Sequence, residues 1–295
     1  MRGEISGDDN GTHKGCPEKN GSHKNGSHKG CRYTSNRALA VFVATGLITL
    51  LASCSSYSPG GLRIDRNIHA KSQDSRVELV VLHYTYADRA QSLKILSEGN
   101  VSSHYLITDD AVPHVYQLVS ENRRAWHAGV SQWYGHNNLN AASIGIEIVN
   151  RGPEGSHWAA YTPAQIATVI TLLRDIIQRH QIKPYDVVGH SDIAPQRKTD
   201  PGPAFPWKQL AQAGIGRWYD QAQARLYESN FKRNGLPDIA WIQKELKRVG
   251  YDTPSTGVLD HATKRVIAAF QMHYRPSRYD GVPDAETAAI LKALP

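Results

Sequence analysis

Apolar residues in the middle of the chain follow the spacing of buried strands. Residues 76–84 (RVELVVLHY) and 143–149 (SIGIEIV) are continuous β-branched runs, typical of strands buried in a mixed or parallel sheet. Shorter runs with strand character lie at 103–108, 114–118 and 185–189. The first two of these short runs flank a turn, so we expect them to pair. The pattern predicts one central sheet.

Helical spacing appears between these strands. Residues 162–180 form the clearest helix, because Thr162 can cap its first turn, Pro163 occupies the first helical position and Gln165 completes a capping box. Its apolar positions recur at helical spacing and form one buried face: Ile166, Val169, Ile170, Leu173 and Ile177. A second helix is predicted over 87–98. Strands alternating with helices predict an α/β (α+β) domain, a mixed central sheet flanked by helices.

From Leu236 onward the pattern changes to short helices alone. They are predicted over 238–249, 260–273 and 284–294, and each begins with an Asp that can cap it. About sixty residues can just hold a core of their own, so a small all-helical domain is expected here. The predicted organisation is a leader with signal peptide (1–53), a tether (54–75), the α/β domain (76–215), a linker (216–235) and the helical domain (236–295).

The N-terminal region has the pattern of a secretory signal. An apolar run at 38–52 follows Arg32 and Arg37, and it is shorter than the ~20 residues that a transmembrane helix needs. Its end, Leu-Ala-Ser-Cys54, resembles a bacterial lipobox, which implies a lipid on Cys54. Ser55 at the next position resembles lipoproteins of the outer membrane, facing the periplasm. The alternative is an ordinary signal peptide with a chance cysteine.

Charge and cysteine content narrow the function further. The formal net charge is +7, and residues 1–53 hold seven basic against four acidic residues. The remainder interleaves 27 basic with 23 acidic residues, without a dense basic stripe, so no nucleic-acid partner is expected. Cys16, Cys31 and Cys54 all precede the α/β domain, so no cysteine there can form a disulfide or bind a metal. A monomer is expected.

Two near-identical segments, 10–16 (NGTHKGC) and 25–31 (NGSHKGC), precede the signal. Clustered His and Cys can bind metal. A leader that is removed, or upstream sequence that is not translated, explains them equally simply and is the interpretation we favour.

Two histidines and a carboxylate are placed where a catalytic metal could bind. His83 ends the strand 76–84, and His190 follows the strand 185–189 directly. Asp200 comes ten residues later in a Pro/Gly-rich loop. Two His and one carboxylate suit a single zinc ion with an open fourth position, where a bound water has a pKa of ~7. A structural role is common for any one such His, so the set is what indicates a site.

Several motifs occur in an order that resembles the zinc-dependent N-acetylmuramoyl-L-alanine amidase family 2. They are His83-Tyr84-Thr85, Ala125-Trp126-His127-Ala128-Gly129, Ile144-Gly145-Ile146-Glu147, and His190 followed by Pro195–Pro203 (PQRKTDPGP). The resemblance covers about residues 76–210. It implies one zinc ion on His83, His190 and Asp200, and catalytic roles for Glu147 and Lys198. The chemistry agrees, because Glu147 could move a proton from water to the leaving nitrogen and Lys198 could face the oxyanion.

The chain departs from the family at one position. Some members have a Tyr before the residue that matches His104, whereas this chain has Ser103, which leaves Glu147 as the obvious base. The matching motifs also place His104, Trp126 and His127 as candidate substrate-binding residues. For the histidines a structural role is an equal alternative.

The helical domain resembles peptidoglycan-binding domain 1, on motifs such as Thr256-Gly257-Val258-Leu259-Asp260 and Asp280-Gly281. The resemblance implies wall binding, and the residues themselves show only turns and helix caps. The expected function is hydrolysis of the amide between N-acetylmuramic acid and L-alanine in peptidoglycan and muropeptides. Open alternatives are a non-catalytic recognition protein, a wall-tethering lipoprotein and a zinc peptidase that cuts within the stem peptide.

Overall fold

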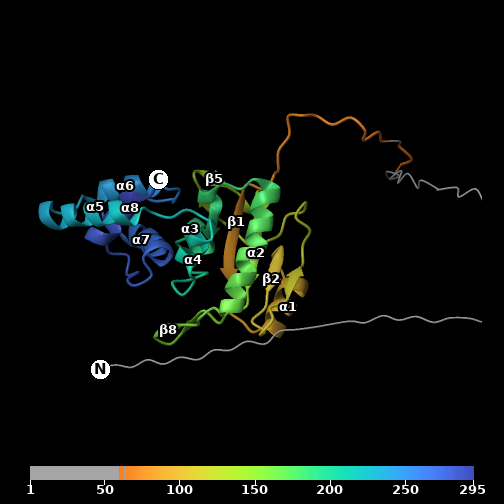
Figure 1. Ribbon diagram of the computed structural model, residues 1–295, viewed down its shortest axis with the longest axis horizontal. Coiled ribbons are helices and arrows are strands. Elements are labelled where there is room, and N and C mark those ends of the chain that lie inside the picture. Colours follow the sequence, from red (N-terminus) through yellow and green to blue (C-terminus); the bar gives the residue numbers. More distant parts are fainter. Residues whose placement is uncertain (1–59, 63) are drawn as a thin grey trace, which may run out of the picture. The chain divides into compact units, whose positions relative to one another are not determined.

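The structure is a computed structural model that describes residues 60–62 and 64–295 (Figure 1). The predicted leader and signal peptide (1–53) and the lipidation site Cys54 lie outside these residues. Where the structure describes the predicted tether, it has no helix or strand. The fold below is that of the unit 69–295. No helix within the described residues is long and apolar enough to cross a membrane.

A five-stranded sheet forms the centre of the α/β domain, as predicted. Its strands lie in the order β3-β2-β6-β1-β9. Their bounds are Leu79–Tyr84 (β1), Tyr105–Ile107 (β2), Val115–Gln117 (β3), Ser143–Ile148 (β6) and Val187–Gly189 (β9). Neighbours are parallel except β2 and β3, which form the expected antiparallel pair. The sheet is therefore mixed.

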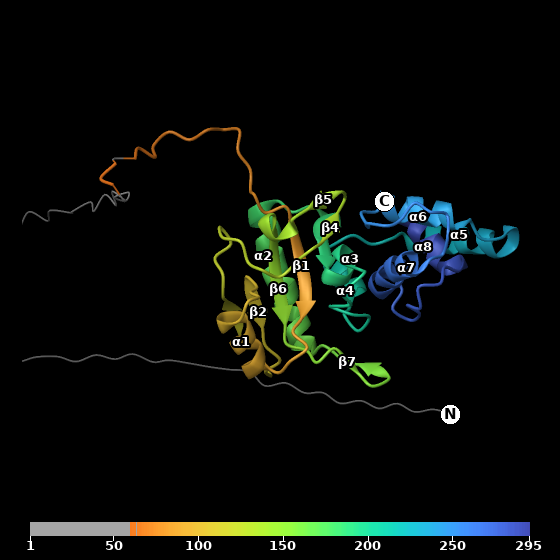
Figure 2. The same cartoon turned by 180° about the vertical axis from the view of Figure 1, so that it is seen from behind.

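The two faces of the sheet have different coverings. Helix α2 (Pro163–His180) lies along one face, and its predicted capping box between Thr162 and Gln165 is present (Figures 1 and 2). Its buried residues pack with Val80, Leu82 and the three isoleucines of β6. Ile176 is fully buried whereas Ile177 is only partly buried, so the buried face is rotated slightly from the prediction. Alternation along the strands sends the remaining side chains to the opposite face.

That opposite face carries shorter elements. Helix α1 (Arg89–Glu98) contributes Leu96 to a small core with Leu106 of β2. Helix α3 (His190–Ile193) follows β9 directly. Helix α4 (Trp207–Gln212) comes next in the chain, but its Trp207 and Leu210 pack into the core beneath α2. Two hairpins and two short 3-10 turns were not predicted: β4 (Gln132–Trp133) with β5 (His136–Asn137), β7 (Pro153–Glu154) with β8 (His157–Trp158), η1 (Leu139–Ala141) and η2 (Pro184–Asp186). Two-residue strands are too short for a detectable sequence period.

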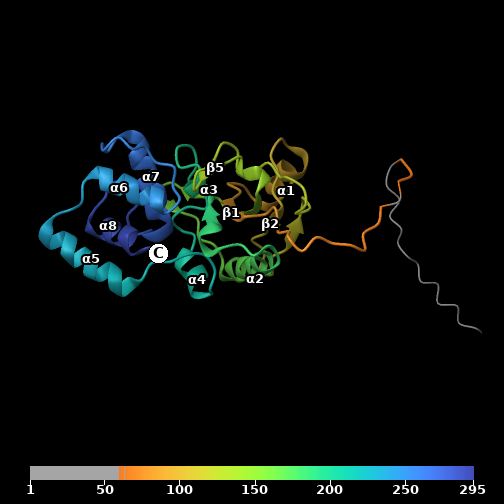
Figure 3. The same cartoon turned by 90° about the horizontal axis from the view of Figure 1, so that it is seen from above.

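The C-terminal helices form a group beside α3 and α4 (Figure 3). The predicted three are α6 (Ile239–Arg248), α7 (His261–Tyr274) and α8 (Ala285–Ala293). Their caps Asp238, Asp260 and Asp284 each accept a hydrogen bond from the backbone N–H three residues on, as expected.

The segment 216–235, which we predicted to be a linker, contains a further helix. It is α5 (Gln221–Asn234), which packs along α8. Its apolar side is narrow, because Ala224 is the only buried residue of this helix. Two aromatic rings make its other contacts: Phe231 lies against Trp241 with ring centroids 6.0 Å apart, and Lys292 of α8 lies 4.4 Å from the centre of the Tyr227 ring. Such a sparse apolar stripe gives a weak periodic signal, because tertiary packing rather than local pattern stabilises this helix.

Candidate zinc site

The sheet positions His83 and Glu147 side by side. Strands β1 and β6 are parallel, and His83 lies opposite Glu147 in their register. The preceding residues, Leu82 and Ile146, are fully buried in the core beneath α2. Because side chains alternate along a strand, His83 and Glu147 both point to the other face.

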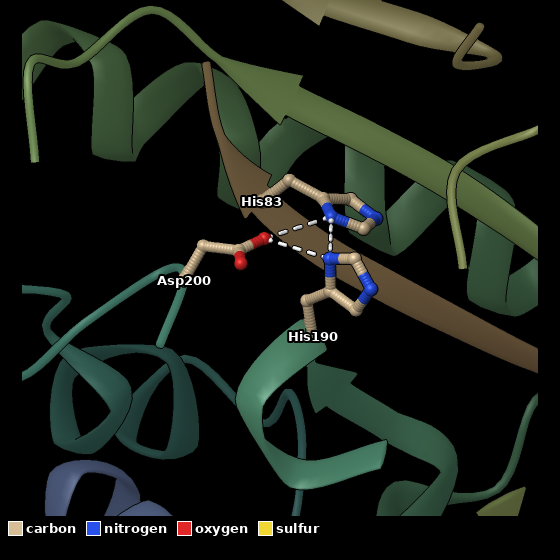
Figure 4. Close-up of side chains that lie close together, drawn as sticks. All are labelled: His83, His190 and Asp200. Atoms are coloured by element: carbon tan, nitrogen blue, oxygen red, sulfur yellow. Dashed lines mark hydrogen bonds and ion pairs between the residues drawn. The ribbon is translucent and has the colours of Figure 1, made fainter. Parts of the chain in front are cut away.

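His190 and Asp200 reach the same place from the next strand. His190 is the first residue of α3, directly after β9, which pairs with β1. Asp200 lies within the following loop, 194–206, and its carbonyl accepts a hydrogen bond from the Ser191 N–H at 2.8 Å. His83 Nδ1 lies 2.9 Å from His190 Nδ1 and 2.9 Å from Asp200 Oδ2, and His190 Nδ1 lies 3.0 Å from that oxygen (Figure 4). All three side chains are buried.

Burial and mutual charge favour the metal-binding forms of these groups. Burial, assisted by the charge of His190, lowers the pKa of His83 to about 4. Burial alone would raise the pKa of Asp200, but the charges and hydrogen bonds of His190 and His83 hold that pKa below its usual range. At neutral pH His83 is therefore a neutral imidazole and Asp200 a carboxylate, which are the forms that bind a metal.

The donor set fits a cation. The Nε2 of His190 lies 3.1 Å from the Ala128 carbonyl, which can only accept, and 3.2 Å from Arg197 Nη2, which can only donate. A metal on Nδ1 requires the tautomer whose Nε2–H donates to the carbonyl. The lone pair of the neutral ring is then on Nδ1, which faces His83 and Asp200. Three electron-rich atoms converge, and a bound cation would offset their repulsion. Two His nitrogens and one carboxylate oxygen form a donor set typical of zinc.

His127 holds the ring of His83 from behind. His83 Nε2 lies 3.1 Å from His127 Nδ1, and His127 Nε2 lies 3.1 Å from Ser143 Oγ, whose hydroxyl donates to the Leu139 carbonyl at 2.6 Å. One consistent direction of donation runs from His83 to Leu139, and it leaves the Nδ1 lone pair of His83 free for a metal. A Cβ at Gly145 would lie 2.4 Å from the His127 ring, so this glycine makes the space for it.

Glu147 is half-buried beside the cluster, and its buried Oε2 has no hydrogen-bond partner among the described residues. Burial and the nearby Asp200 raise the pKa of Glu147 well above its usual value, and Lys198 partly opposes this rise. A buried carboxyl that lacks a partner is costly, and this cost is common at functional sites.

A cavity of about 450 Å³ opens over this cluster. Glu147, Lys198 and Trp126 line it together with His83, His190 and Asp200. The Trp126 side chain is 51% exposed, and the Arg124 guanidinium lies 4.2 Å from its ring centre. The predicted ligands and catalytic residues therefore share one cavity, with an exposed aromatic ring on its wall.

The structure corrects the prediction for His104. We expected this residue to bind substrate, but His104 is 1% exposed and does not line the cavity. Its Nδ1 accepts from the Gly145 N–H at 3.0 Å, and its Nε2 lies 3.0 Å from the Arg123 carbonyl. Nδ1 thus holds β6 in place and Nε2 holds the loop at Arg123, so neither ring nitrogen is available to a substrate. His127 lines the cavity, but both of its nitrogens are also engaged, so it acts on His83.

Sequence analysis missed the residues that support the site. Asn140 accepts hydrogen bonds from the N–H groups of His127 and Ala128, at 3.0 and 2.7 Å. Asp192 is 1% exposed and accepts from the Gly189 N–H at 2.7 Å, directly before His190. The small residues at alternate positions of β6, Ser143 and Gly145, were the available signal, because they leave room on the face that Glu147 shares.

Comparisons with known proteins agree with this site. Residues 73–203 match the family described as N-acetylmuramoyl-L-alanine amidase, and residues 235–291 match a putative peptidoglycan binding domain. The chain is 44% identical over 258 residues to N-acetylmuramoyl-L-alanine amidase AmiD of Escherichia coli (strain K12), across 83% of this chain and 93% of that protein.

Two solved structures are similar over most of their length. The crystal structure of AmpDh3 from Pseudomonas aeruginosa has a TM-score of 0.75 and 45% identity, across 79% of this chain and 97% of that one. A complex of AmiD from E. coli with anhydro-N-acetylmuramic acid-L-Ala-D-gamma-Glu-L-Lys has a TM-score of 0.72 and 45% identity, across 79% and 94%. The chain therefore belongs to the N-acetylmuramoyl-L-alanine amidase family, enzymes that hydrolyse the amide bond between N-acetylmuramic acid and L-alanine of peptidoglycan.

Proposed function

We propose that the protein catalyses this hydrolysis with one zinc ion held by His83, His190 and Asp200. The observation that carries the proposal is the convergence of three buried ligand atoms beside Glu147, whose Oε2 has no hydrogen-bond partner in the described part of the chain. Zinc in such a site acidifies a water and polarises a carbonyl. The chain itself must then move one proton and stabilise one negative charge.

Glu147 is the residue that moves the proton. It takes a proton from the attacking water, whose oxygen forms a bond to the lactyl carbonyl carbon. The C–N bond then breaks, and Glu147 delivers the same proton to the nitrogen of L-alanine. A raised pKa makes the Glu147 carboxylate a stronger base, and the protonated group can hold the proton until the nitrogen leaves.

Lys198 and Trp126 serve the substrate. The half-buried Lys198 lines the cavity two residues before Asp200, where its ammonium can face the negative charge that develops on the carbonyl oxygen. The exposed Trp126 ring offers a flat surface to a sugar or peptide.

The substrate class is peptidoglycan and its soluble muropeptides, consistent with turnover or remodelling of the wall. The supporting fact is that the similar AmpDh3 was solved with an anhydromuramic pentapeptide and AmiD with an anhydromuramyl peptide. The lipobox-like sequence at Cys54 supports attachment to the outer membrane through lipid, facing the periplasm, and we propose that the protein acts there as a monomer.

The test is mass spectrometry of peptidoglycan incubated with the purified protein, with and without a zinc chelator. Stem peptides that begin at L-alanine, lost on chelation and restored by added zinc, are expected. Fragments cut within the stem peptide would instead identify a peptidase, and bound but uncut wall would identify a recognition protein. Fractionation of a Cys54→Ser variant tests the anchor, which is contradicted if the variant still sediments with the outer membrane.

A further inference from the structure

A second buried cluster joins the C-terminal domain to the helix that carries His190. At its centre is Asp192 in α3, which is 1% exposed. Its Oδ1 accepts from the Tyr251 hydroxyl at 2.6 Å, and its Oδ2 lies 2.7 Å from His273 Nδ1. A carboxylate can only accept, so His273 Nδ1 carries the proton. Two of the three hydrogen bonds to this buried carboxylate therefore come from the C-terminal domain.

The His273 ring is fixed by stacking between the domains. Its centre lies 3.8 Å from that of Trp207 in α4, at an interplanar angle of 11°, and 4.1 Å from that of Tyr274. His273 is 5% exposed. The donor of the hydrogen bond to Asp192 is thus held rigidly against the α/β domain.

Helix α7 contacts the same ligand-bearing segment at two further points. The Arg265 Nε donates to the Pro195 carbonyl at 3.1 Å, and Gln196 Nε2 donates to the Ala262 carbonyl at 3.0 Å. Ala262, Arg265 and His273 lie on one face of α7, at helical spacing. This face of α7 therefore contacts α3 and the start of the loop that leads to Lys198 and Asp200.

The space between the cluster and the metal ligands is tightly filled. A Cβ on Gly189 would lie 2.6 Å from Pro201 Cδ and 3.2 Å from Trp207. Gly189 also donates its N–H to Asp192, immediately before His190. A shift of Asp192 would consequently move the backbone that positions His190.

We propose that Tyr251 and His273 are positioning residues of the zinc site, so that the C-terminal domain sets the affinity of the catalytic domain for zinc. The inference rests on the proposed zinc function. It gives this domain a role in catalysis that is independent of any binding to the wall.

The experiment is a zinc affinity measurement by competition with a chromophoric chelator, on the whole protein and four variants. Tyr251→Phe and His273→Leu each remove one donor to Asp192, and we expect each to bind zinc about 10-fold more weakly. His273→Asn keeps an N–H donor near the Nδ1 position and should recover most of the affinity. Thr287→Val is the matched control, because it removes a buried hydroxyl that accepts from Gln271 within the C-terminal domain, away from α3.

The outcomes separate this inference from the proposed function. If the unaltered protein binds no zinc, the proposed function fails. If it binds zinc and Tyr251→Phe and His273→Leu bind equally well, only the inference fails. Weaker binding by Thr287→Val to the same extent, with the same loss of thermal stability, would also overturn it, because general destabilisation would then explain the effect.

Discussion

Two buried clusters of histidine and carboxylate share helix α3. They differ in whether each hydrogen-bond acceptor in the cluster has a donor. Around Asp192, three donors point at one carboxylate. Around Asp200, two imidazole nitrogens and the carboxylate face one another, and Glu147 beside them has an oxygen without a partner among the described residues. The first cluster is complete as a set of hydrogen bonds, whereas the second has an excess of acceptors.

The balance of donors and acceptors distinguishes a cluster that stabilises the fold from one that can bind a metal, and it does so better than residue type or burial. Both clusters are buried, and both combine His with Asp. A fully donated carboxylate stabilises a fold because its desolvation is repaid. Converging acceptors gain stability only when a cation binds. The four predictions below test that contrast, from the largest expected effect to the smallest.

Replacing the unpartnered acid should have the largest effect. Glu147→Gln keeps the shape of the side chain but cannot carry the proton, so kcat should fall by ~10³-fold or more. Zinc affinity and thermal stability should stay close to those of the unaltered protein, because the buried oxygen makes no hydrogen bond that the change would break. Steady-state kinetics on a soluble muropeptide measure this. A loss below tenfold would assign the proton transfer to another group.

Replacing Asp192 or Asp200 by Asn should lower the free energy of unfolding by different amounts, and zinc should reverse which variant is the less stable. Without zinc, Asp192→Asn leaves three donors facing an amide and should lower the free energy of unfolding by about 3 kcal/mol. Asp200→Asn should change it much less, because it removes a charge from a set of converging acceptors. With zinc in excess the order reverses, since Asp200→Asn removes a zinc ligand and with it most of the stabilisation by the metal, whereas Asp192→Asn keeps all three ligands. Urea denaturation with and without a chelator gives all four values, and equal losses for both variants in the chelated protein would refute the contrast.

Replacing Lys198, the cationic residue beside the site, should lower the rate of catalysis without changing the affinity for zinc. Lys198→Met should lower kcat by ~10²-fold, because it removes a charge that stabilises the oxyanion. Zinc affinity should be unchanged. Lys208→Met, on the exposed surface of α4, is the matched control. A change in KM alone would indicate that Lys198 binds the substrate in its ground state.

A third cluster, nearer the surface, should give the smallest effect. The hydrogen bonds of Arg179, followed by those of Tyr105 and His180, outweigh burial and lower the pKa of Glu121 to about 2. The folded state therefore favours the carboxylate, so its contribution is complete above about pH 4.5 and disappears as the pH falls toward 2. Glu121→Gln should lower stability by about 1–2 kcal/mol at pH 7 and by almost nothing near pH 2.

Thermal unfolding across this pH range measures the effect, with Glu98→Gln at the exposed end of α1 as the control. A difference that does not depend on pH would contradict the assigned cause.

Much of the fold and the grouping of the candidate ligands His83 and His190 could be predicted from local pattern, whereas the roles of Glu147 and Lys198 came from the family resemblance. The strand ending in His83, the cap of α2 and the Asp caps of the C-terminal helices are encoded within a few residues of each element. The supporting contacts could not be predicted in this way. Asp192 and His273 are 81 residues apart, and no local spacing shows that they meet. His104 was misassigned for the same reason, since its partners at Gly145 and Arg123 are set by tertiary structure.

The shared core between the two domains limits how the chain can be recombined. Val188 and Ile193 from the catalytic side and Tyr251 and Phe270 from the C-terminal side belong to one cluster of buried residues. Deleting or exchanging the C-terminal domain would expose this apolar surface to water next to β9. A chimaera that keeps a soluble catalytic unit must therefore carry a substitute for the face of α7 that covers this surface.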